Sequence, residues 1–461
     1  MLTRSRTARR RSALPVGLSD TMITATFGLG IIAVWIWLVV QLGWVAGFFA
    51  GWVIAPMTGV AGALLMAVWT VPLRNEDVLS LRRRRRRSEA DASPSCTPRA
   101  ISVVMPVYNG ETYLRCSLPP LIAMVADGAL AEVLIIDDGS TDASAAYARG
   151  LGATVIGSGG RKGPGAARNL AIAHARGDIL WFVDADVVVH AGVAQYIHGA
   201  FAKPNVVAVF GSYDDRPAAP NFGSQYKNLV HHHYHQHADM EASTFWSGCG
   251  AVTKEAFAEI GGFDAETYRM PSVEDVDLGY KLRETGGAIR LDRRLLSTHL
   301  KVWSIAELVK TDIFRRAIPW ARMMLRRSEL LDDLNVGTFE RLRAVLAGAF
   351  VVILGAVLGG VISPWWLAPT LLTILTANWH LFRLFYRRRG LVFAIGGLLF
   401  HQLYYLYSAA AFVFCWLEAK LFGRRRQPSR TESAAASPFS PQAAARESAV
   451  AVKESRLTEV S

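Results

Sequence analysis

Long apolar runs at both ends of the chain constrain its fold more than any other feature. Met22–Val40 and Trp44–Val71 carry no charge, and each is long enough to cross a bilayer. Only a short link separates them and it holds no small-residue cleavage site, so we predict a hairpin of two spans rather than a signal peptide. Two further apolar runs lie at Val345–Ala377, interrupted by "ISPWW", and at Leu391–Leu417.

Positive charge gathers beside these runs. The formal net charge is +12, and arginine clusters lie at 4–11, Arg82–Arg87, Arg387–Arg389 and Arg424–Arg426. Basic patches also occur in nucleic-acid-binding proteins, but their position next to apolar spans favours the positive-inside rule. We therefore expect a multi-pass protein of the cell (plasma) membrane, with the polar middle of the chain in the cytosol and no nucleic-acid partner.

The chain divides accordingly into six segments. We predict a basic cytosolic N-terminus at 1–21, two transmembrane helices at 22–72, a basic linker at 73–98, a globular domain at 99–327, C-terminal membrane helices at 328–422 and a disordered tail at 423–461. The number of C-terminal spans, two or three, stays open. An odd count would place Arg424–Arg426 on the outer side against the rule, and an interfacial or re-entrant segment would remove that conflict.

The middle of the chain has an α/β pattern. Short β-branched runs at 101–109, 132–137, 153–157, 178–184 and 206–211 alternate with helical patterns, which indicates a largely parallel sheet. One helical pattern, at 114–125, contains Pro119 and Pro120, which should kink or break it. Another covers 165–177. In such sheets ligands bind at the carboxyl ends of the strands.

Acidic pairs follow two of these strands. "WFVDADVVVH" ends a buried run with Asp184 and Asp186, and "IIDDGSTD" places Asp137 and Asp138 at another strand end. Carboxylates spaced in this way can hold Mg²⁺ or Mn²⁺ while leaving positions open for substrate phosphates. A solvated turn explains a lone DxD equally well, but it does not require the second acidic pair.

Two further motifs point to the same edge of the sheet. "GSGGRKGPGAARN" (157–169) is glycine-rich and leads into a helix, which suits a diphosphate, with Arg168 on the first turn; a flexible loop is the plain alternative. "PSVEDVDLGYKL" opens a helix with Glu274 and Asp275. Acids are common in first helical turns, but one of them could also serve as a general base.

Histidines provide one ambiguous motif. "HHHYHQH" (231–237) has zinc-like spacing without HExxH, and we favour a helix that faces an acceptor or an interface over a zinc site. His299 follows a short apolar run and could complete a coordination shell begun by Asp186. The four cysteines show no zinc or CxxC spacing and are expected to be free thiols.

Taken in order, the motifs resemble those of the inverting family-2 glycosyltransferases. The resemblance covers about 101–325 and rests on "VVMPVYNG", "IIDDGSTD", "GPGAARNLAIAHARGD", "FVDAD", "FWSGCGAVTKEAF" with "IGGFD", and "VEDVDLGYKL". It implies the GT-A fold, a nucleoside-diphosphate sugar as donor and a Mn²⁺ or Mg²⁺ ion.

The resemblance also implies roles for matching residues. It assigns the donor pocket to Pro106, Tyr108, Asn109, Asp137 and Asp138, with Arg168 and Asp184 nearby. It assigns the metal to Asp184, Asp186 and His299, and the catalytic base to Asp275, whose pair is Glu274. It places the acceptor wall at Trp246, Gly248 and Cys249.

One departure concerns the reaction. Processive members of this family carry a Gln-x-x-Arg-Trp element. The corresponding stretch "DIFRRAIPW" (312–320) has Arg315, Arg316 and Trp320, which the resemblance also assigns to the acceptor, without the glutamine or the Arg-Trp adjacency. We therefore expect a single sugar to be transferred to a lipid-linked or membrane-proximal hydroxyl. The alternatives are a processive polysaccharide synthase, a nucleotidyl- or phosphosugar transferase, and a nucleotide-binding membrane scaffold without catalysis.

Overall fold

A computed structural model of the chain describes residues 99–327 and 337–422. The predicted N-terminal spans, the basic linker and the tail lie outside the described residues. The chain forms two compact units. The described part of the larger unit comprises 99–327, 337–344 and 375–422, and that of the smaller comprises 345–374.

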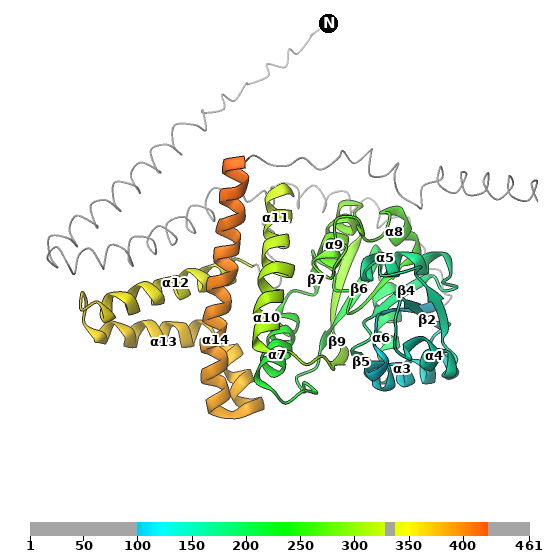
Figure 1. Cartoon of the computed structure of the whole chain (residues 1–461), viewed down its shortest axis with the longest axis horizontal. Coiled ribbons are helices and arrows are strands. Elements are labelled where there is room, and N and C mark those ends of the chain that lie inside the picture. Colours follow the sequence, from blue (N-terminus) through cyan, green and yellow to red (C-terminus); the bar gives the residue numbers. More distant parts are fainter. Residues whose placement is uncertain (1–98, 328–336, 423–461) are drawn as a thin grey trace, which may run out of the picture. The chain divides into compact units, whose positions relative to one another are not determined.

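A mixed sheet of nine strands forms the centre of the larger unit (Figure 1). The strands are β1 Ile101–Val107, β2 Glu132–Asp137, β3 Thr154–Gly157, β4 Ile179–Val183, β5 Val187–Val189, β6 Val206–Tyr213, β7 Glu241–Ala242, β8 Cys249–Thr253 and β9 Ala288–His299. Their order is β3-β2-β1-β4-β8-β6-β9-β5, with β7 on β9. The neighbours among β1 to β4 are parallel, as the sequence predicts, and β8 runs antiparallel to both β4 and β6.

Helices cover both faces of the sheet because its central strands are apolar on both sides. α3 (Glu111–Ala126), α4 (Ser144–Gly150) and α6 (Ala194–Phe201) share one core with the strands, and α5 (Pro164–Leu170), α8 (Lys254–Glu259) and α9 (Glu274–Glu284) share the other (Figure 1). Fully buried Val103 and Val104, adjacent in β1, belong to the two different cores.

Two helices differ from their predicted form. α3 is one helix that includes Pro119 and Pro120; its Leu114, Leu118 and Leu121 are fully buried, and this packing outweighs the lost backbone hydrogen bonds. The helix predicted at 165–177 is shorter, since α5 ends at Leu170 and a 3₁₀ turn covers Ala171–Ala173.

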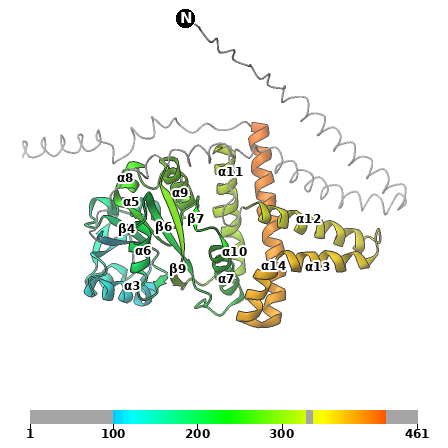
Figure 2. The ribbon, with the colours of Figure 1, turned by 180° about the vertical axis from the view of Figure 1, so that it is seen from behind.

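The larger unit also contains a second group of helices, apart from those that cover the sheet. It contains α7 (Phe222–His237), α10 (Ile305–Thr311), a π-helical turn η2 (Asp312–Ala317), α11 (Ile318–Arg327) and α14 (Trp379–Phe422). Gly390 has a φ of 81° and interrupts α14. Both views show α14 running alongside α11 (Figures 1 and 2).

The predicted interruption at "ISPWW" is present. α12 (Thr338–Leu358) ends before it, a 3₁₀ turn covers Pro364–Trp366, and α13 (Leu367–Ala377) follows. Among the described residues, α12 and α14 are long and apolar enough to cross a membrane, by length and composition alone.

Candidate active site

The turn after β4 presents the two acids of "DAD". Backbone bonds hold it in place: Asp184 N–H donates to Gly248 O at 3.1 Å, and Leu300 N–H donates to Asp186 O at 2.8 Å. Ser117 Oγ donates to Ala185 O at 2.7 Å. The start of β8, the end of β9 and helix α3 therefore fix this turn at the carboxyl end of β4.

Asp186 and His299 form a pair, as the sequence predicts. His299 Nε2 lies 3.4 Å from Asp186 Oδ2. Burial opposes ionisation, but the His299 hydrogen bond and charge lower the pKa of Asp186. On the other side of the ring, His299 Nδ1 meets Asn228 Oδ1 at 2.9 Å. Because an amide oxygen only accepts, Nδ1 carries a proton, and in the neutral ring the Nε2 lone pair would be free for a metal ion beside Asp186.

The Tyr213 ring also contacts His299. The two rings stack with centroids 4.5 Å apart and planes at 9°. Asn228 and Tyr213 thus fix the orientation and tautomer of a predicted metal ligand, a role in which outer-shell residues usually serve. Sequence reasoning missed both residues, since a lone Asn inside α7 and a Tyr at the end of β6 give no signal.

Arg168 lies between two carboxylates instead of contacting the glycine-rich loop. Its NH2 donates to Asp184 Oδ1 at 2.5 Å, and its NH1 lies 3.7 Å from Glu274 Oε1. The guanidinium is buried, with 3% of the side chain exposed. Burial raises the pKa of Asp184 despite this arginine, and burial together with the neighbouring Asp275 raises the pKa of Glu274 to about 7.

Asp275 lies on the first turn of α9, beside the start of β8. Its Oδ2 accepts from Ser247 N–H at 3.2 Å, and its Oδ1 accepts from Val276 N–H at 2.9 Å. Burial raises the pKa of Asp275, while the Ser247 bond and the charges of Arg168 and Arg316 act in the opposite direction. The Ser247 N–H that donates to Asp275 belongs to the residue before Gly248, whose O accepts from Asp184 N–H. Arg168 also joins Asp184 to Glu274, so Asp184, Asp186 and Asp275 lie close together.

Asp138 has a different environment from these acids. Its carboxylate accepts from Ser158 Oγ, Lys162 N–H and Gly163 N–H at 2.7, 2.9 and 2.8 Å. Gly163 has a φ of +91°, and a Cβ there would lie 2.2 Å from Arg269 O, so only glycine fits. Asp138 thus shapes the glycine-rich loop, and its contact with a nucleobase stays a prediction. Asp137 Oδ1 accepts from Ser140 N–H at 3.1 Å.

The end of β1 lies beside this loop. Asn109 adopts a φ of 49°, and its Oδ1 accepts from Thr141 N–H at 2.7 Å. Half-buried Pro106 precedes exposed Tyr108, whose ring lies 4.2 Å from the guanidinium of Arg161. Loop and strand ends therefore form one surface with an aromatic face and a cation, as a nucleotide requires.

Aromatic rings form the predicted acceptor wall. Trp246 packs edge-on against Tyr213 at 4.8 Å and lies 4.6 Å from His231. Gly248 leaves room for that indole, since a Cβ there would lie 2.6 Å from its ring. The Cys249 side chain is fully buried in the core, and burial raises the pKa of its thiol to about 12. Cys249 therefore lies behind this wall rather than on its surface.

The histidine motif belongs to the same wall. The His231 and His235 rings contact each other in a tilted arrangement with centroids 3.9 Å apart, and His235 Nδ1 contacts Gly211 O at 2.8 Å. Burial and the neighbouring His235 lower the pKa of His231, which keeps it neutral. Within the described ranges there is no group of three His, Cys, Asp or Glu side chains arranged for a metal, so the histidines form no zinc cluster there.

The segment compared with the processive element forms the π-helical turn η2. Buried Asp312 binds Lys227 Nζ at 2.5 Å and Tyr407 OH at 3.0 Å, and Arg316 NH1 lies 3.9 Å away. The Arg316 side chain is half exposed, and its positive charge opposes the rise in the pKa of Asp275. π-helical turns are rare and often occur at functional sites. The Lys227–Asp312 pair had no sequence signal.

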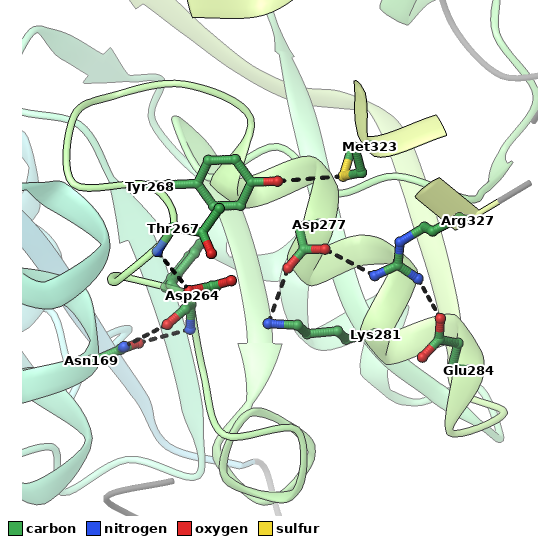
Figure 3. Close-up of polar contacts among 10 residues, drawn as sticks. Asn169, Asp264, Thr267, Tyr268, Asp277, Lys281, Glu284, Met323 and Arg327 are labelled. Carbon is green, nitrogen blue, oxygen red and sulfur yellow. Dashed lines mark hydrogen bonds and ion pairs between the residues drawn. The ribbon is translucent and has the colours of Figure 1, made fainter. Parts of the chain in front are cut away.

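The other predicted residues of this segment hold α9 in place. Arg315 O accepts from Ser272 Oγ at 2.8 Å, and Trp320 Nε1 lies 3.2 Å from Tyr280 OH. Figure 3 shows the neighbouring links, in which Arg327 of α11 pairs with Asp277 and Tyr268 OH points to Met323. Arg315 and Trp320 thus contribute to the position of the acidic helix.

The pair Asp186 and His299 fits a divalent ion. Mg²⁺ and Mn²⁺ sites at phosphates use one or two protein ligands and leave the other positions to phosphate and water. Asp186 and His299 present an oxygen and a nitrogen with a fixed lone pair. Asp184 gives one oxygen to Arg168, and because the described residues contain no group of three metal-ligating side chains, it does not form a three-residue set with Asp186 and His299 here. Its role as a ligand stays a prediction.

Comparisons with known proteins agree with this geometry. Residues 102–261 match the family model of Glycosyl transferase family 2. The pre-mycofactocin glycosyltransferase of Mycobacterium tuberculosis is 29% identical over 215 residues, which cover 44% of this chain and 43% of that protein. The putative glycosyltransferase EpsH of Bacillus subtilis is 37% identical over 91 residues, 19% of this chain and 26% of its own length. The chain thus matches less than half of the length of either relative.

Solved structures are similar at lower identity. The mannosyltransferase PcManGT from Pyrobaculum calidifontis, in complex with GDP-Man and Mn²⁺, has a TM-score of 0.40 at 17% identity and covers 79% of this chain and 99% of its own. Glucosyl-3-phosphoglycerate synthase from M. tuberculosis, with Mn²⁺ and UDP-glucose, has a TM-score of 0.34 at 21% identity and covers 52% and 86%.

The family match begins in β1 and ends just after α8, so it contains the strand ends that carry Asp137, Asp138, Asp184 and Asp186. The acidic helix α9 and His299 follow it in the chain. Over residues 102–261 the chain is therefore similar to the family-2 glycosyltransferases, within a mixed α/β sheet.

Proposed function

We propose that the chain transfers one sugar from a nucleoside-diphosphate sugar to a lipid-linked or membrane-proximal hydroxyl, with inversion at the anomeric carbon. The observation that carries the proposal is the convergence of Asp275 with Asp184 and Asp186, beside an aromatic wall. The donor would lie along the ends of β1, β2 and β4, and the acceptor against Trp246 and Tyr213.

The roles follow from the positions of the side chains. Asp275, held by Ser247 N–H, takes the proton of the acceptor hydroxyl as its oxygen attacks the anomeric carbon and the diphosphate leaves. Arg168 keeps Asp184 and Glu274 in position, and Arg316 offers a positive charge on the acceptor side. Asp186 and His299 would hold a Mn²⁺ or Mg²⁺ ion, which neutralises charge on the diphosphate when bound.

Several features support a membrane-proximal acceptor. α12 and α14 have the length and composition of membrane helices, and arginine clusters flank the apolar runs. The plasma membrane as location and a cytosolic catalytic domain are part of this proposal. Single transfer is favoured because the segment 312–320 lacks the Gln-x-x-Arg-Trp arrangement of processive enzymes.

The test is to incubate membranes containing the full chain with a panel of radiolabelled nucleotide sugars and Mn²⁺, and then to extract the lipids. Label in the organic phase, with release of nucleoside diphosphate, is the expected result. Pre-mycofactocin, which gives one relative its name, is added as an alternative acceptor. Release of pyrophosphate would indicate a nucleotidyltransferase, and product growing in length would indicate a processive synthase. No transfer from any donor would contradict the proposal.

A further inference from the structure

Helix α14 carries a stripe of exposed apolar side chains after Gly390. The stripe repeats every three or four residues, with one longer step, and is therefore one face of a helix. Its members are Val392, Ile395, Leu399, Leu403, Ala410, Phe414, Leu417 and Leu421. Val392 is 87% exposed and Leu421 is 74% exposed, so the stripe is open at both ends.

The other sides of α14 are bonded to the catalytic unit along their length. Contacts to the domain lie at the start, middle and end of this stretch: His401 Nδ1 lies 2.7 Å from Tyr226 OH, Tyr407 OH donates to Asp312 at 3.0 Å, and Glu418 accepts from Arg322 Nε at 2.9 Å. Before the interruption at Gly390, Arg389 Nε also donates to Gln225 Oε1 at 2.5 Å.

These contacts are difficult to reconcile with a helix that crosses the bilayer. Residues 391–422 extend about 48 Å at about 1.5 Å per residue, whereas the hydrocarbon core is about 30 Å thick. If α14 crossed it, the elements bonded to α14 would enter the hydrocarbon as well. They include the Lys227–Asp312 ion pair, and charges are costly there.

Contacts at the two ends of residues 345–374 indicate on which side of the membrane the following residues lie. Arg343 Nε donates to Ala377 O at 2.9 Å, and Tyr405 OH donates to Glu340 at 2.7 Å and lies 3.2 Å from Asn378 Oδ1. All of these residues belong to the larger unit. The chain therefore leaves that unit at 344 and returns to the same place at 375, so Arg387–Arg389 stay on the side of the catalytic domain.

We propose that α14 lies in the plane of the membrane, with its stripe inserted at the boundary between headgroups and acyl chains of a bilayer that contains anionic lipids. Amphipathic helices with basic residues bind membranes in this way. Arg387 precedes the stripe, Arg388 and Arg389 beside it bind Asp215 and Gln225, and Lys420 lies at its end. An in-plane helix leaves these residues on one side, as the positive-inside rule requires.

The inference deepens the proposed function, because a lipid-borne acceptor would reach η2 and Arg316 along this surface. It is tested by depth in the bilayer, without catalysis, so the two proposals can fail separately. The full chain with Cys96 and Cys116 replaced by serine receives single cysteines at Val392, Leu403 or Leu421. Each variant is spin-labelled in vesicles of phosphatidylcholine and phosphatidylglycerol, and its accessibility to oxygen and to a water-soluble nickel reagent gives the depth of the label.

An in-plane helix predicts three similar depths, about 5–10 Å below the headgroups. A separate chain in which only Cys96 is replaced by serine keeps the native Cys116, which is exposed in the catalytic domain. A label there should remain fully accessible to nickel. The proposal is overturned if the Leu403 label is deepest and the other two are exposed to water, because that profile belongs to a spanning helix. It is also overturned if all three labels are shielded from both reagents, because another protein segment then covers the stripe.

Discussion

The donor side and the acceptor side of the candidate site are built in different ways. On the donor side, the strand ends β1, β2 and β4 and the loop 157–163 are joined by short bonds, with Asp138 accepting three of them. On the acceptor side, Trp246, Tyr213 and Arg316 come from separate elements, and an ionic network through Asp312 reaches α14. If the proposed sides are right, donor binding depends on one local scaffold, and acceptor binding depends on contacts between residues far apart in the sequence.

The largest effect is expected where the two sides meet. Asp275→Asn keeps the hydrogen bond from Ser247 N–H but removes the base, so kcat should fall about 10²–10⁴-fold. The donor Kd should stay within about twofold of the unchanged chain, because Asp275 contacts no donor-side loop. Single-turnover rates and titration with the donor separate the two quantities. Unchanged turnover would assign the base to another group.

The second largest effect is expected from a substitution that disrupts only the proposed donor side. Asp138→Ala leaves Lys162 N–H and Gly163 N–H without their acceptor, and bonds to a charged group contribute about 1.5–3 kcal/mol each. We expect the Kd for nucleoside diphosphate, measured by calorimetry, to rise about 100-fold. Asp142→Ala is the control, since that carboxylate accepts from Ser144 and from Glu111 N–H and has no bond to the loop 157–163 among those of the described residues. Equal effects in both variants would show that the loop does not depend on Asp138.

A smaller effect is expected at the predicted metal ligand. Asn228→Ala removes the acceptor of His299 Nδ1–H, so the imidazole loses its fixed orientation and Mn²⁺ affinity should fall about 10–100-fold. Electron paramagnetic resonance of free Mn²⁺ measures this without turnover. The matched control is Asn221→Ala, at the start of the same helix, whose side chain binds Trp303 O. If both variants bind Mn²⁺ as the unchanged chain does, His299 is not a ligand.

The smallest effect is expected from a substitution in α14 that reaches the proposed acceptor side only through Asp312. Tyr407→Phe removes one hydrogen bond to Asp312, so Arg316 should be held less firmly and the acceptor KM should rise about 3–10-fold, or about 1 kcal/mol. The donor KM should not change. Tyr386→Phe on the same helix, at an exposed position, serves as the control. A loss of stability without a change in acceptor KM would restrict Tyr407 to a structural role.

The difference between local and long-range contacts also explains which parts of the site the sequence could predict. Short-range patterns at strand ends point to Asp184, Asp186 and His299, and the start of a helix points to Glu274 and Asp275. The structure places these residues near one another, and their roles stay predictions. Asn228, Lys227 and Asp312 were missed, because their importance arises from partners 71 to 85 residues away. The antiparallel strands β5 and β8 were also missed, since strand direction depends on chain connections that periodicity does not report.

The anomeric configuration of the product tests the central claim most directly. If Asp275 activates the acceptor for direct attack, an α-linked nucleotide sugar must give a β-linked product. The coupling constant of the anomeric proton in the purified product, measured by NMR with the donor that the membrane assay identifies, decides the question. The account predicts inversion, and retention of configuration would contradict it.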